Sequence, residues 1–173
     1  TAEFIRRNDE FTVNIALIKN GKPIMGLIHA PELEECYFAS RGLGAYKKAN
    51  DKKPRRIRVK PTCRKHVVIA GSNSHPSEEF NRFVAKLGDH IMLSMGSSLK
   101  SCLVAEGTAD IYARLGPTSE WDTAAAQCIV EEAGGRLTDT NMQPLSYNTK
   151  ESLLNPHFFV FGDCEKDWSS YLD

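Results

Sequence analysis

The stretch that organises this chain is Glu120-Trp121-Asp122-Thr123-Ala124-Ala125-Ala126, which leads on to Gly134-Gly135. Its alanines, followed by Ile129 and Val130, predict a helix of small residues, and Gly134 suits the left-handed position just beyond a helix C-terminus. We expect Asp122 to be the N-cap, because aspartate accepts hydrogen bonds from the first free N–H groups of a helix. Capping alone would explain Asp122, but a carboxylate at the start of a helix also suits metal or phosphate chemistry.

Around this helix, strands and helices alternate after residue 60, which is typical of an α/β layer. The clearest helix signal follows Ser74-His75-Pro76, where residues 80, 83, 84 and 87 are apolar at helical spacing. Another helix is expected from Gly96-Ser97-Ser98 to Gly107. The strands expected in this part of the chain are residues 67–70, 91–95, 110–113, 136–139 and 158–161.

The front third of the chain predicts an antiparallel meander. Apolar and polar residues alternate through residues 11–17, and residues 24–29 follow the turn signal Asn20-Gly21, as in a β-hairpin. A second pair of short strands is expected at residues 36–39 and 45–47.

Lysines and arginines then crowd residues 48–60, which we interpret as a linker or a charged edge segment rather than a polyanion-binding surface. The chain is thereby divided into residues 1–47, 48–60 and 61–173. The fold class predicted is α/β, in the form of an α+β layered sandwich.

Composition narrows the classes of function. The 22 Lys and Arg residues balance the 22 Asp and Glu residues, so charge gives no reason to expect nucleic acid or a membrane surface as partner. No apolar run approaches the length of a membrane span. The 5 cysteines form no CxxC pair, which favours reduced thiols in a cytoplasmic protein. Because the first residue is Thr, we expect a processed or truncated piece.

Three predicted strand-to-helix junctions carry polar clusters, at residues 72–75, 96–100 and 120–123. In an α/β sheet such junctions gather at the carboxyl ends of the strands, where helix N-termini favour an anion such as phosphate. Lys100 and Arg114 would add full positive charges. Asp122 would oppose phosphate binding unless a divalent cation is present, because the metal turns a repelling carboxylate into part of an anion site.

Each of these residues also has a simpler interpretation. Ser97 and Ser98 are residue types common in turns and caps, and His75 is compatible with a surface position. Lys100 and Arg114, taken singly, resemble solvated charges, and the turn before Lys100 lacks the spacing of a P-loop. The expectation of a phosphate site therefore depends on the residues occurring together.

Several short segments of this sequence resemble one family, the lithium-sensitive, magnesium-dependent phosphomonoesterases that include inositol monophosphatases and 3′(2′),5′-bisphosphate nucleotidases. The run from Trp121 to Ala125, followed by Gly134-Gly135, is similar to that family's C-terminal signature. The similarity to the bacterial nucleotidases of the family extends along essentially the whole chain. The other runs that carry it are Glu10-Phe11-Thr12-Val13-Asn14-Ile15-Ala16-Leu17, Gly96-Ser97-Ser98-Leu99-Lys100, Val104-Ala105-Glu106-Gly107 and Leu154-Asn155-Pro156.

The resemblance implies a partial sugar-phosphatase-like fold with Mg²⁺ as cofactor. In the family, most metal ligands come from an upstream glutamate and an Asp-Pro-Ile/Leu-Asp-Gly-Thr segment, whose final residue Thr1 matches. We therefore expect a C-terminal fragment in which residues 1–47 are the remainder of an N-terminal antiparallel-sheet domain and the strand at 11–17 is half-covered. A missing N-terminal portion or a partner chain would be needed to complete the site.

For the intact protein, the resemblance implies removal of the 3′-phosphate of adenosine 3′,5′-bisphosphate to give AMP and phosphate. Thr1 and Asp122 are the implied catalytic residues, and Asp122 is the implied metal ligand. An inositol or sugar monophosphatase and a non-catalytic nucleotide-binding fragment remain alternatives. For the 173-residue chain by itself, we expect an inactive fragment with no function of its own. The expected location is cytoplasmic or peripheral to the inner membrane. The implied substrate-binding residues are Ser74, His75, Gly96, Ser97, Ser98, Lys100 and Arg114.

Overall fold

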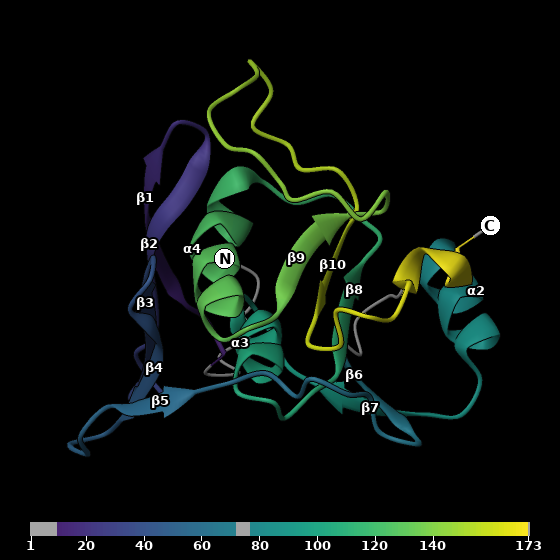
Figure 1. The fold of residues 1–173 in the computed structure, drawn as a ribbon, viewed down its shortest axis with the longest axis horizontal. Coiled ribbons are helices and arrows are strands. Elements are labelled where there is room, and N and C mark those ends of the chain that lie inside the picture. Colours follow the sequence, from purple (N-terminus) through teal and green to yellow (C-terminus); the bar gives the residue numbers. More distant parts are fainter. Residues whose placement is uncertain (1–9, 72–76, 173) are drawn as a thin grey trace.

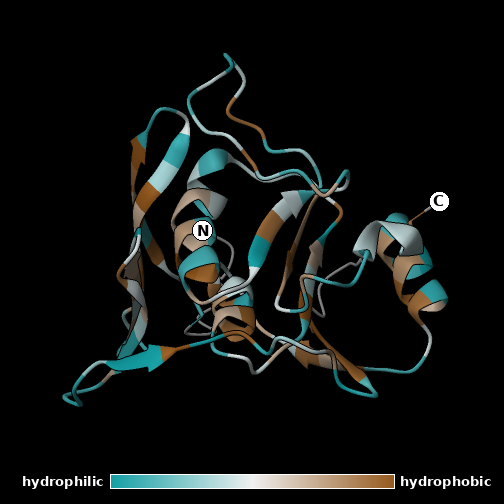
Figure 2. Ribbon diagram, viewed as in Figure 1, coloured by the Kyte–Doolittle hydropathy of each residue, from teal (hydrophilic) through white to brown (hydrophobic). Residues whose placement is uncertain are grey.

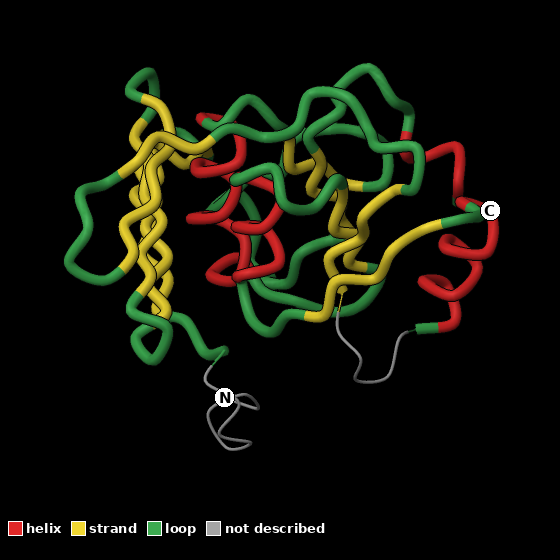
Figure 3. The backbone as a smooth tube through the Cα atoms, turned by 90° about the horizontal axis from the view of Figure 1, so that it is seen from below, coloured by secondary structure: helices red, strands yellow, loops and turns green. Residues whose placement is uncertain are grey.

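The computed structural model describes residues 10–71 and 77–172. These residues form two five-stranded sheets with two helices between them and a third helix on the far side of the second sheet (Figures 1 and 3). The layers are thus sheet, helices, sheet and helix, and the predicted layered α/β sandwich is confirmed. Alanines and other small residues in the middle layer allow both sheets to approach it closely.

The first sheet is an antiparallel meander with the strands in chain order, as predicted. Asn20 and Gly21 both have positive φ, 52° and 74°, which is the two-residue turn that matches the twist of a hairpin. The basic segment also contributes a short edge strand. The strands are β1 (Val13–Lys19), β2 (Lys22–Ala30), β3 (Glu35–Ser40), β4 (Gly44–Ala49) and β5 (Arg55–Ile57).

The outer face of this sheet is apolar and open in the described structure. Val13, Ile15 and Leu17 are about half exposed and alternate with less exposed residues along β1, and the β1 ribbon carries hydrophobic, brown segments in Figure 2. The expectation of a half-covered first strand is therefore confirmed. The inner face of the same sheet contacts the middle layer of helices.

The second sheet is mixed, with the strand order β7-β6-β8-β10-β9. Its strands are β6 (Val67–Gly71), β7 (His90–Ser94), β8 (Ile111–Arg114), β9 (Arg136–Asp139) and β10 (Phe158–Phe161). β6 is parallel to β7 and β8, while β10 is antiparallel to β8 and β9. The carboxyl ends of β6, β7 and β8 consequently lie at one edge, which is where the predicted polar junctions were expected to gather.

The outer helix, α2 (Glu78–Leu87), buries Phe80 and Phe83 against the second sheet and lies beside the 3₁₀ turn η1 (Trp168–Tyr171). Its N-cap is Ser77, whose hydroxyl accepts from the N–H of Phe80 at 3.1 Å. The helix therefore begins later than the Ser74-His75-Pro76 start predicted from sequence, because Ser77 supplies the cap. Among the described residues, no helix is long and apolar enough to cross a membrane.

The middle layer contains α3 (Leu99–Ala105) and α4 (Glu120–Glu132), which contact each other. α4 also contacts β1, β2, β3, β4 and β9, so it is the element that joins the two sheets. Gly26 of β2 faces the backbone of Ala125, where any side chain at position 26 would overlap Ala125. The alanines at residues 124–126 of α4 thus set the close spacing between this helix and the first sheet.

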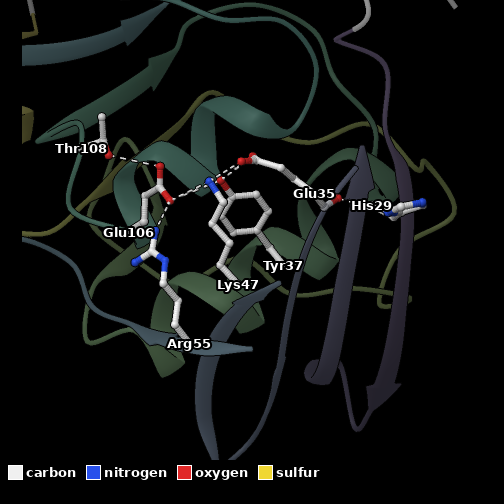
Figure 4. A network of polar contacts seen from close by, with 7 residues as sticks. All are labelled: His29, Glu35, Tyr37, Lys47, Arg55, Glu106 and Thr108. Atoms are coloured by element: carbon white, nitrogen blue, oxygen red, sulfur yellow. Dashed lines mark hydrogen bonds and ion pairs between the residues drawn. The ribbon is translucent and has the colours of Figure 1, made fainter. Parts of the chain in front are cut away.

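A polar network also ties the first sheet to the end of α3 (Figure 4). The Glu106 carboxylate accepts from Lys47 Nζ at 3.1 Å, Tyr37 Oη at 3.3 Å and Arg55 Nη2 at 3.3 Å. Lys47 Nζ also lies 2.7 Å from Glu35 Oε1. Because the side chains of Lys47 and Glu106 are only 11% and 10% exposed, the partners of each charge must compensate for the hydration that it has lost.

The division of the chain into residues 1–47, 48–60 and 61–173 remains a prediction.

Candidate functional site

A pocket of about 240 Å³ lies where the junction after β7 meets the junction after β8. It brings together five of the site residues predicted from the sequence: Ser97, Ser98, Lys100, Arg114 and Asp122. Gly96 precedes Ser97 in the same turn and does not line the pocket. Thr1, Ser74 and His75 lie outside the described residues. The remaining lining residues are Ser101, Tyr112, Pro117, Thr118 and Phe158.

The turn that contains Ser97 and Ser98, called the serine turn below, is held by Asn14 of β1 and by Thr12, which directly precedes β1. Ser97 has a left-handed φ of 50°, and its Oγ lies 2.6 Å from Thr12 Oγ1. Asn14 Nδ2 donates to Ser98 Oγ at 2.8 Å and to the Trp121 carbonyl at 3.3 Å. Ser98 is the N-cap residue of α3, but its hydroxyl makes no capping hydrogen bond. Both hydroxyls therefore shape the wall of the pocket through contacts distant in sequence.

Lys100 is buried, with only 7% of its surface exposed, so it is not the solvated charge of the simpler interpretation. Its Nζ donates to the Met95 carbonyl at 3.2 Å and lies 5.4 Å from the centre of the Tyr112 ring. A buried ammonium is costly unless it is compensated, and the carbonyl and the aromatic ring contribute to this compensation.

Arg114 extends from the end of β8 into the same pocket. Its Nη2 donates to the Pro117 carbonyl at 3.2 Å, while its Nε is buried without a hydrogen-bond partner among the described residues. A guanidinium is always charged at neutral pH and offers a planar set of donors that suits phosphate. Arg114 and Lys100 together give the pocket a positive wall.

Asp122 is the third helical residue of α4, and the prediction that it is the N-cap is wrong. The N-cap is Ser119, which has extended φ and ψ of −118° and 162°. Asp122 instead reaches back, and its Oδ2 accepts from the Ser119 N–H at 2.9 Å. This is the capping-box arrangement, and the sequence signal for it was a serine three residues before the acidic residue. The Asp122 side chain is exposed at the pocket, as the site prediction required.

The loop before α4 is held by Asn155, to which the sequence analysis assigned no role. Asn155 Nδ2 lies 2.7 Å from the Ser119 carbonyl, 3.0 Å from Thr123 Oγ1 and 3.2 Å from Thr118 Oγ1. The Ser119 residue is thus bound on one side by Asn155 and on the other by Asp122. Asn155 belongs to one of the runs that carry the family resemblance, and Thr12 and Asn14 belong to another. Their place in these motifs was the one sequence signal that could have indicated their role at the site.

A larger pocket of about 330 Å³ lies between β1 and the start of α4. Its one charged lining residue, Glu120, is only 6% exposed and is paired with Lys150, whose Nζ lies 2.8 Å from Glu120 Oε1. Burial acts to raise the pKa of Glu120, but the hydrogen bonds from Lys150 and from the Asn148 N–H outweigh it and lower the pKa. Because the charge of Glu120 is already paired, the smaller pocket with Lys100, Arg114 and Asp122 is the better candidate of these two.

The described residues do not make a metal centre by themselves. Within residues 10–71 and 77–172, no group of three or more His, Cys, Asp or Glu residues is placed to hold a metal ion. Asp122 is the one acidic residue among those lining the pocket, and one of its oxygens already accepts from Ser119. Mg²⁺ requires an octahedral set of oxygen ligands, which a single carboxylate does not supply.

The fold and pocket define an α/β protein of the sugar-phosphatase type, with a pocket lined by Lys100 and Arg114 at the carboxyl ends of parallel strands. The model of the inositol monophosphatase family matches residues 1–163, and the chain belongs to that family. The family and its CysQ members are in general metal-dependent phosphatases.

Among curated proteins, the chain is similar to the 3′(2′),5′-bisphosphate nucleotidases CysQ of Salmonella typhimurium and Haemophilus influenzae. Identity to the first is 47% over 160 residues, covering 92% of this chain and 63% of that protein. Identity to the second is 39% over 171 residues, covering 98% of this chain and 64% of that protein. The chain therefore spans slightly less than two thirds of the length of these relatives.

Solved structures give the same fold. The crystal structure of CysQ from Bacteroides thetaiotaomicron superposes with a TM-score of 0.83 at 43% identity, covering 92% of this chain and 65% of that one. An inositol monophosphatase from Zymomonas mobilis matches with a TM-score of 0.81 at 24% identity, covering 98% of this chain and 65% of that one, which shows the fold alone. The predicted family and fold class are confirmed.

Proposed function

We propose that the protein is a Mg²⁺-dependent phosphomonoesterase that removes the 3′-phosphate of adenosine 3′,5′-bisphosphate, giving AMP and phosphate. The observation that carries this proposal is the pocket in which Lys100 and Arg114 lie with Asp122. Two cations in one small pocket suit a phosphate group that remains on the product, and a ligand with two phosphate groups has such a group. The nucleotidase activity named for the relatives at 39% to 47% identity supports the same substrate class.

The residues of this chain would bind and orient the substrate. Lys100 provides a buried point charge and Arg114 a planar donor set, so together they favour a phosphate that remains on the product. The Gly96 to Ser98 turn would supply the wall beside that phosphate. Ser74 and His75 are proposed as nucleotide contacts from the resemblance, and Thr1 as the residue that positions water.

Asp122 is proposed as one carboxylate ligand of the Mg²⁺ site. The other ligands would come from outside the described residues, because these supply one pocket carboxylate only. The missing N-terminal portion or partner chain expected from the resemblance would bring them. The 173-residue chain on its own is accordingly expected to bind the nucleotide without hydrolysing it.

Two other functions remain candidates. An inositol or sugar monophosphatase has no use for a second-phosphate site, and the presence of both Lys100 and Arg114 in the pocket disfavours it. For this chain alone, the single carboxylate in the pocket favours a non-catalytic nucleotide-binding fragment.

The cytoplasmic location also stays a prediction, and no finding supports peripheral association with the inner membrane.

The test is phosphate release with Mg²⁺ from adenosine 3′,5′-bisphosphate and from inositol 1-phosphate. Both the 173-residue chain and the full-length product of its gene are assayed. We expect activity in the full-length protein, selective for the nucleotide, and none in the chain alone. Preference for inositol 1-phosphate would overturn the substrate assignment, and hydrolysis by the chain alone would overturn the account of the metal ligands.

A further inference from the structure

Tyr112 of β8 lines the candidate site, although no sequence motif assigned it a role. The residue is only 7% exposed, yet its hydroxyl makes no hydrogen bond with any described residue. The hydroxyl is not one of the fully buried polar atoms without a partner, so its oxygen remains accessible from the pocket. A hydroxyl that faces a pocket and has no partner among the described residues is free to donate to a ligand, and it is therefore informative about what the pocket binds.

The position of this hydroxyl is fixed by the packing of the ring. Phe158 of β10 contacts it edge to face, with the ring centres 5.7 Å apart and the planes at 89°. Lys100 Nζ lies 5.4 Å from the Tyr112 ring centre. Because Phe158 and Lys100 also line the pocket, the tyrosine is held between an aromatic wall and a cation.

The hydroxyl is a neutral donor at physiological pH. Burial raises the pKa of Tyr112 to about 12, with Arg114 lowering it and Asp122 raising it further. A protonated phenol can donate to an anionic oxygen, and it adds no negative charge that would repel one.

We propose that the Tyr112 hydroxyl donates to a phosphate oxygen of the ligand held by Lys100 and Arg114, and so selects phosphorylated ligands over their dephosphorylated forms. The inference rests on the proposed function, because it assigns a further binding residue to the same pocket. A site whose buried donor needs an acceptor discriminates strongly against a ligand that lacks one. Tyr112 is thus a specificity-determining residue that neither the sequence motifs nor the charges of the pocket indicate.

The test compares Tyr112→Phe with the wild-type chain by calorimetric titration with AMP and with adenosine. The substitution removes one oxygen and leaves the ring to pack on Phe158, so the fold should be preserved. Tyr46→Phe is the matched control, because Tyr46 stacks on Phe38 in the first sheet, away from the pocket. We expect Tyr112→Phe to raise the Kd for AMP about tenfold and to leave the Kd for adenosine unchanged.

The same variants in the full-length protein separate this inference from the proposed function. Tyr112→Phe should raise KM for adenosine 3′,5′-bisphosphate about tenfold with a smaller change in kcat, while Tyr46→Phe changes neither. AMP binding that depends on Tyr112 without hydrolysis in the full-length protein would overturn the function alone. Hydrolysis and AMP binding unaffected by Tyr112→Phe would overturn the inference alone, and a full-length protein that neither hydrolyses adenosine 3′,5′-bisphosphate nor binds AMP would overturn both.

Discussion

Asn14 of β1 donates through its Nδ2 to Ser98 Oγ, 2.8 Å away, although 84 residues separate them in the chain. The same amide nitrogen lies 3.3 Å from the Trp121 carbonyl in α4. One side chain of the first sheet therefore joins the serine turn to the start of the helix that carries Asp122. The geometry of the candidate site depends on this contact between layers.

Replacing Asn14 should consequently loosen the pocket. For Asn14→Ala we expect a loss of about 1–2 kcal/mol in the free energy of unfolding, because the buried Ser98 hydroxyl loses its donor. Affinity for AMP should fall as well. Urea denaturation and calorimetric titration measure the two effects, with Asn81→Ala on the exposed face of α2 as control. Equal changes in both variants would contradict the bridging role.

Asp122→Asn separates the charge of this side chain from its hydrogen bond. The asparagine carbonyl can still accept from the Ser119 N–H, so the free energy of unfolding should change by less than about 1 kcal/mol. Turnover of the full-length protein should fall by orders of magnitude, because the proposed ligand loses its charge. Phosphate release measures this, beside Asp89→Asn at an exposed position as control. Near wild-type turnover in Asp122→Asn would remove the proposed metal role.

Glu106→Gln tests the polar network in Figure 4. The variant keeps the shape of the side chain but removes the charge that faces Lys47, which is only 11% exposed. We expect a destabilisation of about 1–3 kcal/mol, because a buried charge loses one of its partners. Glu78→Gln breaks an exposed pair with Arg82 and should have little effect. Thermal or chemical unfolding that treats the two variants alike would show that the network adds no stability.

The Glu120–Lys150 pair predicts a dependence of stability on pH. The pKa of Glu120 is lowered in the folded protein, so its contribution to stability is present above the unfolded-state pKa of about 4.3 and is lost as the pH falls further. Lys150→Met should therefore destabilise the chain at pH 7 and do so much less at pH 3. Chemical denaturation at both pH values measures the difference. Exposed Lys65→Met is the control, and a cost for Lys150→Met that is independent of pH would refute the pairing.

Much of the fold was predictable because its signals are local. The Asn20-Gly21 turn, the apolar spacing that leads to Phe80 and Phe83, and the alternation along β1 each involve residues close in sequence. The start of α4 shows the limit of such signals. Ser119 and Asp122 both suit an N-cap, and Ser119 holds that place in a structure where Asn155 binds its carbonyl at 2.7 Å, from 36 residues away.

The sequence by itself determined the family, the layered α/β class and five of the residues that line the pocket, because motifs and periodicity are properties of neighbouring residues. Only the tertiary structure decided that Lys100 is buried, that Thr12 and Asn14 shape the serine turn, and that the Tyr112 hydroxyl has no hydrogen-bond partner among the described residues. These features arise where parallel strands end at one edge and a third layer packs against them. Burial and hydrogen-bond partners are set there by side chains far apart in sequence, and no local pattern records them.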